Sequence, residues 1–594
     1  MTATVRQEVP RILGGAFLLG ETPATAVCTP EDLTAEERMM GEVAADFVAQ
    51  EVLPRLEAIE HQEPGVMVGL LKRAGELGLF AADVPEAHGG LGLRKAASLL
   101  LAEPLGAVAS FAVSHGAHTC IGTLPLVYFG TPEQQARYLP RLASGEWLGA
   151  YALTEAGSGS DALAAKTTAV GTPDGGYRLN GTKLWITNAG FADLFTVFAK
   201  VDGKDFSAFL VERTFPGISV GPEERKMGIK GSSTRPVHLT DAIVPAKNLL
   251  GEVGRGHVIA FTILNLGRFK LGAGCVGGMK TALKAATQYA ATRQQFGKPI
   301  ASFGLIQGKL ARMAALTFAA ESLLYRTAGL VEHALAGAGS DREAARRALE
   351  EVAVECALGK VFCTEALDAV VDEAVQIFGG YGYSQEYPVE RFYRDSRINR
   401  IFEGTNEINR LLAAGMLLKR AAQGRFPLLP AMKAVQEAIL APPEPPASEE
   451  GPLAPEAERV RQGRQATLLL AGLAYQKYGE RLGEEQEVLG GLSDLILALF
   501  AAESALLRGA RGLAGGGPPK AAAAADLARA AVAEGVATLE ATARRLLPSL
   551  AEGDALRSTA GALRKVLRAL PPDLVALHRK NAAAALAAGG YPLA

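Results

Sequence analysis

The chain has 594 residues, of which 48% are hydrophobic and 21% charged, and its formal net charge is −2. Because this length exceeds what a single hydrophobic core supports, we expect several domains. The near-zero net charge gives no global electrostatic basis for binding nucleic acid.

Five scattered cysteines do not make a disulfide framework, which fits a reducing compartment and predicts a cytoplasmic location. We find no apolar run near the ~20 residues that a membrane-spanning helix requires. The first residues contain a short apolar piece but no convincing signal-peptide cleavage site.

The first predicted domain, residues 1–150, is helical, because apolar residues recur at intervals of three and four from about residue 34. His115, His118 and Cys120 could suggest a metal site, since positions three apart share a helix face. No acidic partner lies nearby and small residues surround them, so we favour a packed helical segment.

The predicted middle domain, residues 151–258, consists of β-strands. Short β-branched and aromatic runs are separated by Asp-Gly, Asn-Gly and Asp-Gly-Lys turns, a pattern typical of antiparallel hairpins. Two segments here carry polar and aromatic groups suited to ligand binding, Tyr151–Asp161 and Trp185–Asn188. Taken singly, each also reads as an ordinary loop with a strand.

Helical periodicity returns in the predicted bundle, residues 259–425. The run Gly272–Gly277 matches GxGxxG, but the residues before it read as helix and no acid stands ~20 positions later. We therefore reject a dinucleotide-binding site and expect these glycines to allow close helix packing. Asn265 and Arg268 are three residues apart and so share a helix face.

Glu403 stands in IFEGTN, between the apolar pair Ile401–Phe402 and residues that begin a new helix. Gly404 permits backbone conformations that a Cβ would forbid, and Thr405 is a helix-capping type. A carboxylate on such a break, facing an apolar wall, has its pKa raised by desolvation, which suits a general base. The local residues alone leave open an ordinary capping or surface glutamate.

Composition changes again near the C-terminus. Residues 426–455 are predicted to be a linker, because the run Ala441–Pro455 is rich in proline and acidic residues and does not favour packing. Residues 456–594 are rich in Ala, Leu and Arg and are predicted to form an extra helical domain, interrupted near Gly515.

Several motifs in this order resemble the acyl-CoA dehydrogenase family over roughly residues 35–420. They are ALTEAGSGSD, WITN, LNLGRF, RQQFGKP, FGLIQ, the glycine-aromatic run QIFGGYGY and IFEGTN. The family commonly has Pro where Ala156 stands, a conservative departure. The resemblance implies a mainly α fold with a middle β-domain: a helical domain, a β-barrel-like domain and a helical bundle, here extended by the extra C-terminal domain.

The resemblance also implies FAD as cofactor. The implied FAD contacts are Tyr151, Leu153, Thr154, Ser160, Trp185, Thr187, Arg293, Phe296, Gln307, Gln376, Gly379, Gly380, Thr405 and Asn406. In relatives the arginine at the Arg293 position meets the FAD pyrophosphate of the neighbouring subunit, where a bidentate guanidinium suits phosphate. This implies a homodimer or a dimer of dimers.

By the same resemblance Glu403 is the base that removes the α-proton of a fatty acyl-CoA thioester. The implied substrate contacts are Ser160, Asn265, Arg268, Phe402 and Gly404. Some members, such as isovaleryl-CoA dehydrogenases, take the base from the residue before the arginine, where this chain has Gly267. The base is therefore assigned to Glu403, and the implied donors to the thioester carbonyl are its N–H and an FAD ribityl hydroxyl.

The C-terminal extension most resembles the very-long-chain acyl-CoA dehydrogenase subgroup. This implies long or very long acyl chains, a trans-2-enoyl-CoA product in fatty acid β-oxidation, and an electron-transfer flavoprotein as acceptor. In mitochondrial relatives the extension contacts the inner membrane. Here the candidate is Val488–Leu507, with a core or dimer-packing helix as the alternative, because it lacks a basic face.

Two other functions stay open. One is a flavoprotein scaffold or assembly factor of a respiratory complex, although Glu403, Arg268 and Ser160 are present and a scaffold does not need a base. The other is an acyl-CoA oxidase, which would use the same residues with oxygen as the acceptor.

Overall fold

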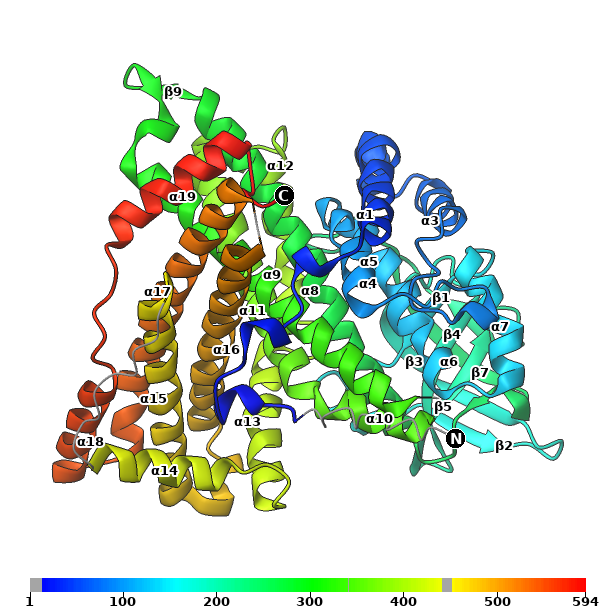
Figure 1. The fold of residues 1–594 in the computed structure, drawn as a ribbon. Coiled ribbons are helices and arrows are strands. Elements are labelled where there is room, and N and C mark those ends of the chain that lie inside the picture. The colour runs from blue at the N-terminus through cyan, green and yellow to red at the C-terminus, as the bar shows by residue number, and fades with distance from the viewer. Residues whose placement is uncertain (1–12, 340, 441–450, 516) are drawn as a thin grey trace, which may run out of the picture.

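The computed structural model describes residues 13–339, 341–440, 451–515 and 517–594. Figure 1 shows the N-terminal helices and the β-sheet on one side of a central bundle of long helices, with further helices along the opposite side. The prediction of a mainly α fold with a middle β-domain and an extra C-terminal helical domain is confirmed.

The N-terminal region is a set of short helices. They are α1 (Ala35–Phe47), α2 (Leu56–Glu60), α3 (Val66–Glu76), α4 (Lys95–Ala102), α5 (Ala109–Gly116), α6 (Leu124–Phe129) and α7 (Pro132–Ser144). Buried Asp83 pairs with Lys95 at the start of α4 and with Lys270 of the bundle. This pair of contacts ties the N-terminal helices to the long helix beside them.

The histidine segment serves packing in the described structure. α5 continues as a π-helical turn over Ala117–Gly122. His118 uses both ring nitrogens, at 3.0 Å from the Leu142 carbonyl oxygen and 2.9 Å from the Gly149 nitrogen. His118 therefore links this turn to α7 and to the first strand.

The middle domain is a twisted sheet with strand order β6-β7-β3-β2-β4-β5-β8, and β1 also pairs with β4. The strands are β1 (Gly149–Ala152), β2 (Thr168–Gly171), β3 (Tyr177–Thr187), β4 (Leu194–Val201), β5 (Asp205–Glu212), β6 (Ile218–Val220), β7 (Thr234–Val244) and β8 (Leu249–Leu250). The hairpins β2–β3 and β4–β5 are antiparallel as predicted, whereas β1 and β2 both run parallel to β4.

One predicted turn was wrong. Asn180-Gly181 lies inside β3, at a register shift against β7. A Cβ on Gly181 would lie 2.4 Å from Thr167 Oγ1, so this glycine permits a close approach at a bulge. The Asn-Gly pair forms a bulge here instead of a turn, because glycine is suited to both a hairpin turn and a β-bulge.

The central bundle contains six helices and a small hairpin, β9 (Gln294–Gln295) with β10 (Lys298–Pro299). The helices are α8 (Gly256–Thr292), α9 (Gly304–Ala338), α10 (Arg342–Glu351), α11 (Ala353–Phe378), α12 (Pro388–Ser396) and α13 (Asn406–Ala422). The GxGxxG run lies inside α8, where a Cβ on Gly277 would come 1.7 Å from the Glu103 carbonyl oxygen. These glycines thus serve close packing, as predicted.

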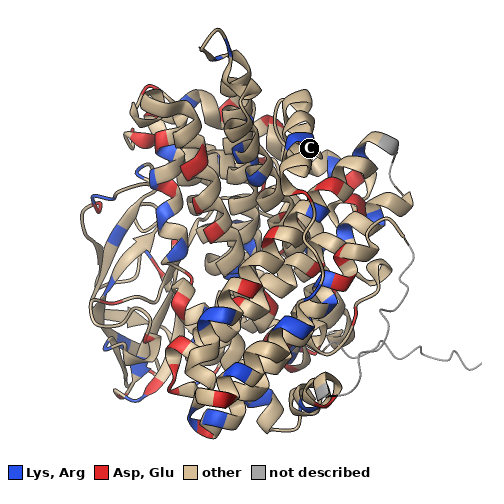
Figure 2. Ribbon diagram, turned by 90° about the vertical axis from the view of Figure 1, so that its left-hand side faces the viewer, with Lys and Arg blue, Asp and Glu red and all other residues tan. Residues whose placement is uncertain are grey.

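The C-terminal helices lie along the far side of the bundle (Figure 1). They are α14 (Leu428–Leu440), α15 (Ala454–Tyr478), α16 (Gln486–Gly515), α17 (Pro518–Leu550), α18 (Gly553–Val566) and α19 (Leu574–Ala588). Figure 2 shows acidic and basic residues interspersed over these helices and the bundle rather than separated by sign.

Two predicted boundaries need correction. The first part of the predicted linker, residues 426–455, contains α14, which buries Leu428 and Met432 in the same core as α15 and α16. Hydrophobic burial outweighs the neighbouring proline-rich composition there, while residues 441–450 lie outside the described residues.

Residues 13–33, assigned by sequence to the N-terminal helical domain, instead pack on the bundle and the C-terminal helices. Phe17 packs against Phe500 of α16 with ring centroids 4.6 Å apart and the rings tilted by 32°, and Gly15 N–H donates to Glu355 of α11 at 2.7 Å. The aromatic and leucine side chains of this short segment have a larger apolar surface to cover there.

The expectation that no segment is apolar enough to span a membrane was also wrong by length and composition. α8 and α16 both meet that test, but 67% and 89% of their most apolar windows are buried inside the fold. The membrane candidate Val488–Leu507 lies within α16, so the alternative, a core helix, describes it. The apolar composition of α8 and α16 follows from their contact with other helices on several sides.

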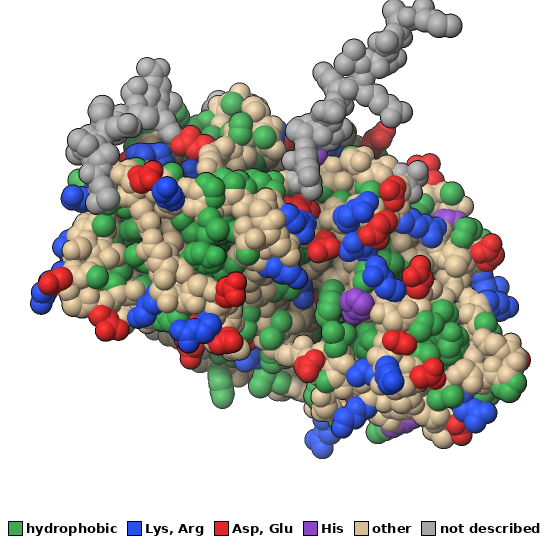
Figure 3. Space-filling view, turned by 90° about the horizontal axis from the view of Figure 1, so that it is seen from below, with side chains coloured by type: hydrophobic (Ala, Val, Ile, Leu, Met, Phe, Trp, Pro, Cys, Tyr) green, Lys and Arg blue, Asp and Glu red, His purple; other side chains and the backbone are tan. Residues whose placement is uncertain are grey.

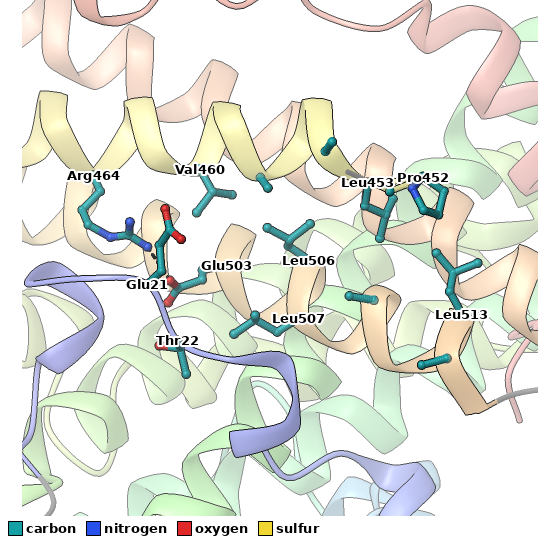
Figure 4. Close-up of a pocket in the computed structure, with 15 residues that line it drawn as sticks. Glu21, Thr22, Pro452, Leu453, Val460, Arg464, Glu503, Leu506, Leu507 and Leu513 are labelled. Carbon is teal, nitrogen blue, oxygen red and sulfur yellow. Dashed lines mark hydrogen bonds and ion pairs between the residues drawn. The ribbon is translucent and has the colours of Figure 1, made fainter. Parts of the chain in front are cut away.

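A cavity of about 550 Å³ lies between residues 21–22, α15 and α16. Figure 4 shows Arg464, Glu21 and Glu503 at one end and leucines at the other. Arg464 donates to Glu503 at 2.6 Å and to the Phe17 carbonyl at 2.8 Å, and Arg326 pairs with Glu503 at 2.8 Å. Glu503, Arg464 and Arg326 are thus paired with one another. The underside in Figure 3 shows hydrophobic side chains in several groups divided by charged ones.

Candidate active site

A cavity of about 960 Å³ lies where the N-terminal helices, the sheet and the bundle meet. Side chains predicted from separate parts of the sequence line it together. They are Tyr151, Leu153, Thr154, Ser160, Trp185, Thr187, Arg268, Phe402, Glu403, Gly404 and Thr405. Folding therefore brings residues some 250 positions apart in the chain to one wall, as Tyr151 and Glu403 illustrate.

Glu403 occupies the turn between a short 3₁₀ helix, Arg397–Arg400, and α13. Thr405 caps α13, with its hydroxyl accepting from the Ile408 N–H at 3.2 Å. Glu403 itself has φ of 58°, a left-handed conformation that costs free energy for a residue with a side chain. The turn thus aims this side chain into the cavity at some cost in backbone strain.

Gly267 makes room for the carboxylate. A Cβ at this position of α8 would lie 2.6 Å from Glu403 Oε2. The missing side chain at Gly267 therefore does more than remove an alternative base, because it provides the space into which Glu403 extends.

The surroundings of the carboxylate raise its affinity for a proton. Glu403 Oε2 is buried and has no hydrogen-bond partner among the described residues. Burial raises the pKa of Glu403 to about 7, and the positive charges of Arg268 and Lys360 oppose part of this rise. A carboxylate with such a pKa can exchange a proton near neutral pH.

The backbone of the turn is held by side chains from three helices, and Asn409 of α13 donates to the Gly404 carbonyl at 2.8 Å. Arg268 Nε donates to the Glu403 carbonyl at 3.0 Å, and Arg268 Nη1 donates to Asn265 Oδ1 at 2.8 Å. Asn265 does not line the cavity but orients the arginine. Lys360 of α11 donates to the Gly404 carbonyl at 2.8 Å.

While the carbonyls of the turn are engaged, the Glu403 N–H has no acceptor among the described residues. A free N–H beside a cation is a donor arrangement suited to a carbonyl or enolate oxygen of a bound molecule. Together with the carboxylate, it can support removal of a proton from a carbon next to a carbonyl.

The part of the cavity wall that the sheet contributes suits a flat, polar-edged ring. Trp185 lies at a β-bulge between Lys183 and Ile186, with φ of 57°, and 61% of the indole residue is exposed. Bulges redirect side chains in this way next to binding sites. Fully buried Lys183 pairs at 2.6 Å with Glu155, which anchors the loop that carries Thr154 and Ser160.

This wall fits the isoalloxazine ring of FAD. An exposed indole can pack against the ring, and the hydroxyls of Thr154, Ser160 and Thr187 can bind its polar edge. The buried Tyr151 hydroxyl lines the same cavity without a hydrogen-bond partner among the described residues. These hydroxyls and the exposed indole suit a heteroaromatic ligand.

The remaining predicted cofactor residues lie elsewhere. Six of them do not line the cavity and stand at the β9–β10 hairpin, on α9 and at the end of α11: Arg293, Phe296, Gln307, Gln376, Gly379 and Gly380. Arg293 lies over the Tyr381 ring at 5.1 Å, and Phe296 is 91% exposed. Within one chain these residues do not complete the cavity.

Asn406 also differs from its predicted position. It is buried and bonded to Lys360 at 2.7 Å and to Glu365 at 3.0 Å, so it supports the turn rather than facing the cavity. Sequence reasoning overlooked Lys360. A lysine within the apolar helical run ALGKVFC was the available signal, since a buried lysine needs a specific partner.

Family models match most of the chain. The acyl-CoA dehydrogenase N-terminal, middle and C-terminal domains match residues 34–146, 150–242 and 254–418. A further model described as acyl-CoA dehydrogenase, C-terminal domain, matches residues 462–565.

The chain is 49% identical over 584 residues to a protein of Bacillus subtilis (strain 168) named "Probable acyl-CoA dehydrogenase", covering 97% of this chain and 98% of that one. It is 41% identical over 403 residues to the very long-chain specific acyl-CoA dehydrogenase of Mus musculus, covering 66% and 59%. The crystal structure of an acyl-CoA dehydrogenase complexed with FAD from Bacillus anthracis superposes with a TM-score of 0.95 at 49% identity, covering 98% and 100%.

Glu403 is expected to titrate with a midpoint near its pKa of about 7, being protonated below that pH and ionised above it. Infrared difference spectra between about pH 5 and 9 should show the protonated carboxyl band disappear with this midpoint in the wild type. Subtraction of the Glu403→Gln spectra isolates the band from other carboxyl groups. A midpoint near the ordinary glutamate value would contradict the burial argument.

Proposed function

The chain belongs to the acyl-CoA dehydrogenase family of FAD-dependent oxidoreductases, and on this premise we propose that it dehydrogenates long-chain fatty acyl-CoA thioesters to trans-2-enoyl-CoA in β-oxidation. The observation that carries the proposal is Glu403, a carboxylate with a pKa of about 7 that projects unpaired into a cavity beside a flavin-binding wall. We further propose an electron-transfer flavoprotein as acceptor and a cytoplasmic location.

In the proposed reaction Glu403 takes the α-proton of the thioester. The Glu403 N–H, which has no acceptor in the described structure, donates to the thioester carbonyl. A preorganised donor of this kind stabilises developing enolate charge by roughly 3–4 kcal/mol. Bound FAD supplies the acceptor for the hydride that leaves the β-carbon, so proton and hydride together account for the two hydrogens removed.

Arg268 and Gly267 prepare this step. Arg268 engages the Glu403 carbonyl and leaves the Glu403 N–H free to donate to substrate, and Gly267 admits the carboxylate. The buried setting of the carboxylate keeps it basic enough to act near neutral pH.

Glu403→Gln is expected to retain FAD and lose turnover by several orders of magnitude, because the amide cannot accept the α-proton. The measurement is anaerobic bleaching of the flavin spectrum by palmitoyl-CoA. Glu407→Gln is a matched control, since this exposed carboxylate lies one turn further along, outside the cavity. Near-wild-type bleaching in Glu403→Gln would remove Glu403 from the role of base.

The same purified, FAD-loaded protein can distinguish a dehydrogenase from an acyl-CoA oxidase and from a flavoprotein scaffold. Oxygen uptake that keeps pace with turnover would indicate an acyl-CoA oxidase, and a bound flavin that no acyl-CoA bleaches would indicate a scaffold. The unpaired Glu403 carboxylate supports catalysis, since a scaffold has no use for it. A peripheral membrane contact through the C-terminal domain would have to use surfaces other than α16, which is mostly buried.

The cavity supports a long acyl chain. Small residues line it along α8 and the N-terminal helices: Ala102, Gly106, Ala107, Ala109, Ala112, Gly116, Ala117, Gly274 and Gly278. Gly274 lies seven residues, about 10 Å of helix rise, beyond Gly267 on the same face of α8. The volume of about 960 Å³ is near the upper end for ligand pockets, roughly 300–1,000 Å³.

Gly274→Leu is expected to shorten the accepted chain. A Cβ on Gly274 would meet nothing within 4 Å, so the added side chain enters the cavity instead of forcing the helices apart. The bleaching rate with palmitoyl-CoA should fall on the order of 10-fold or more relative to octanoyl-CoA.

The matched control for this change is Gly69→Leu, since Gly69 on α3 also has open space around its Cβ position but does not line the cavity. An unchanged ratio of the two rates in Gly274→Leu would show that the acyl chain takes another path.

We also propose a homodimer, in which the Arg293 region completes the cofactor site of a second copy. The support is an exposed apolar patch beside Arg293, where Phe296, Leu305 and Tyr383 are 91%, 86% and 89% exposed. Exposed apolar groups of this size mark interaction surfaces. Arg293 is separated from the cavity in its own chain, so a partner is the economical way to bring the two parts together.

Arg293→Ala is expected to weaken FAD retention on the order of 10-fold or more while leaving the oligomer intact, because a guanidinium pairs with phosphate in a bidentate manner. Flavin release on dilution and sedimentation velocity give the two readouts. Arg312→Ala, at a half-exposed arginine of α9, serves as the control. Full FAD retention by Arg293→Ala, or a monomeric wild type, would contradict the shared site.

A further inference from the structure

A chain of charged and polar side chains connects the C-terminal helical domain to the turn that carries Glu403. It begins at Asp494 on α16, which accepts from Arg410 Nε of α13 at 2.7 Å. Arg410 then holds both carboxylate oxygens of Glu365 on α11, at 2.7 and 2.9 Å. One arginine thus joins three helices.

From Glu365 the chain continues to the turn. Asn406 Nδ2 donates to Glu365 Oε1 at 3.0 Å, and Lys360 Nζ donates to Asn406 Oδ1 at 2.7 Å. The same ammonium donates to the Gly404 carbonyl at 2.8 Å, one residue after Glu403. Every link from α16 to the turn is therefore a hydrogen bond of ordinary length.

The inner part of this chain is buried. Lys360 has no exposed surface and Asn406 is 2% exposed. Hydrogen bonds in such surroundings are strong, and leaving one unmade is costly, so the groups have one preferred arrangement. A lysine in this place needs its polar partners more than a surface lysine would.

The turn needs this support because it is strained. Glu403 adopts φ of 58°, and residues in such conformations persist only where their surroundings hold them. Arg268 holds the turn from α8, and Lys360 holds it from α11. Lys360 is in turn joined to Arg410 through Asn406 and Glu365.

α16 also contacts α13 directly. Ser493, next to Asp494, donates its hydroxyl to the Arg410 carbonyl at 2.5 Å. Ala413 and Leu417 of α13 belong to the same hydrophobic core as Leu489 and Leu492 of α16. Both ends of Arg410, its carbonyl and its guanidinium, are thus fixed by the C-terminal domain.

We propose that Asp494 and Arg410 are positioning residues for Glu403, so that the C-terminal helical domain helps to set the rate of proton removal; this rests on the function proposed above. The two residues act through Glu365, Asn406 and Lys360 and do not touch substrate. The extra domain then has a part in the reaction itself and not only in stability.

The test uses the FAD-loaded full chain and follows anaerobic flavin bleaching by palmitoyl-CoA in single turnovers. Asp494→Ala is expected to slow the bleaching rate constant on the order of 10-fold, because small displacements of a base are costly. The substrate concentration for half-maximal rate should change less than about two-fold. A split of this kind indicates a displaced base rather than weakened binding.

A double variant tests whether the residues act in one chain. The bleaching rate constant of the double variant Asp494→Ala/Arg410→Met should be no lower than that of Arg410→Met alone. Once Arg410 is replaced, the connection to the turn is already broken, so the loss of Asp494 has no further effect. Additive losses would overturn the single chain. Arg410→Lys keeps the charge without the forked geometry, and it should also be slow, whereas a wild-type rate in this mild variant would overturn the proposal.

Two controls separate positioning from general weakening of the domain. Arg545→Ala removes only the outer partner of Asp494, at 3.8 Å and largely exposed. Glu456→Gln breaks a buried pair with Arg459 in the same domain, away from the turn. Both are expected to bleach at the wild-type rate.

The outcomes distinguish this proposal from the proposed function. Suppose that the wild-type protein is bleached and that Asp494→Ala is bleached at the same rate, with a melting temperature lowered as in Glu456→Gln. This result would overturn the positioning role and leave the proposed function standing. A wild type that no acyl-CoA bleaches would overturn the function, and the positioning role with it.

Discussion

The turn at Glu403 is the constraint on which the rest of the structure depends. It places a carboxylate in a buried setting and in a left-handed backbone conformation, two conditions that are unfavourable alone. Cations on two helices offset both, since Arg268 and Lys360 hold the carbonyls of the turn and lower the pKa that burial raises. The pKa of the Glu403 carboxyl is thus held near 7, while the residue still lines the cavity.

The surrounding architecture holds this turn and encloses a cavity beside it. α8 contributes Gly267 for the carboxylate, Arg268 for the turn and Gly274 for the cavity, all on one long helix. The sheet supplies the opposite wall through the bulge at Trp185. The N-terminal segment and α16 then cover the far side of the bundle, where Phe17 meets Phe500.

The sequence predicted those parts of the site in which neighbouring residues indicate the local structure. Glu403 before Gly404 and a helix cap predicts a carboxylate on a break, and the structure places it there. It failed where one residue type suits two structures, as at Gly181, where Asn-Gly marks a bulge and not a turn. It also failed for α14, whose helix lies next to a proline-rich run.

The sequence by itself determined the order of the helical and β regions through its hydrophobic periodicity and turns, and its short motifs carried the resemblance that implies FAD and predicts Glu403 as the base. Only the tertiary structure decided which residues stand together. Lys360 and Asp494 have no local motif, and their roles arise from contacts between helices distant in the chain. The pKa of Glu403 is likewise a property of enclosure, since it depends on how much water and which charges the fold leaves beside the carboxylate.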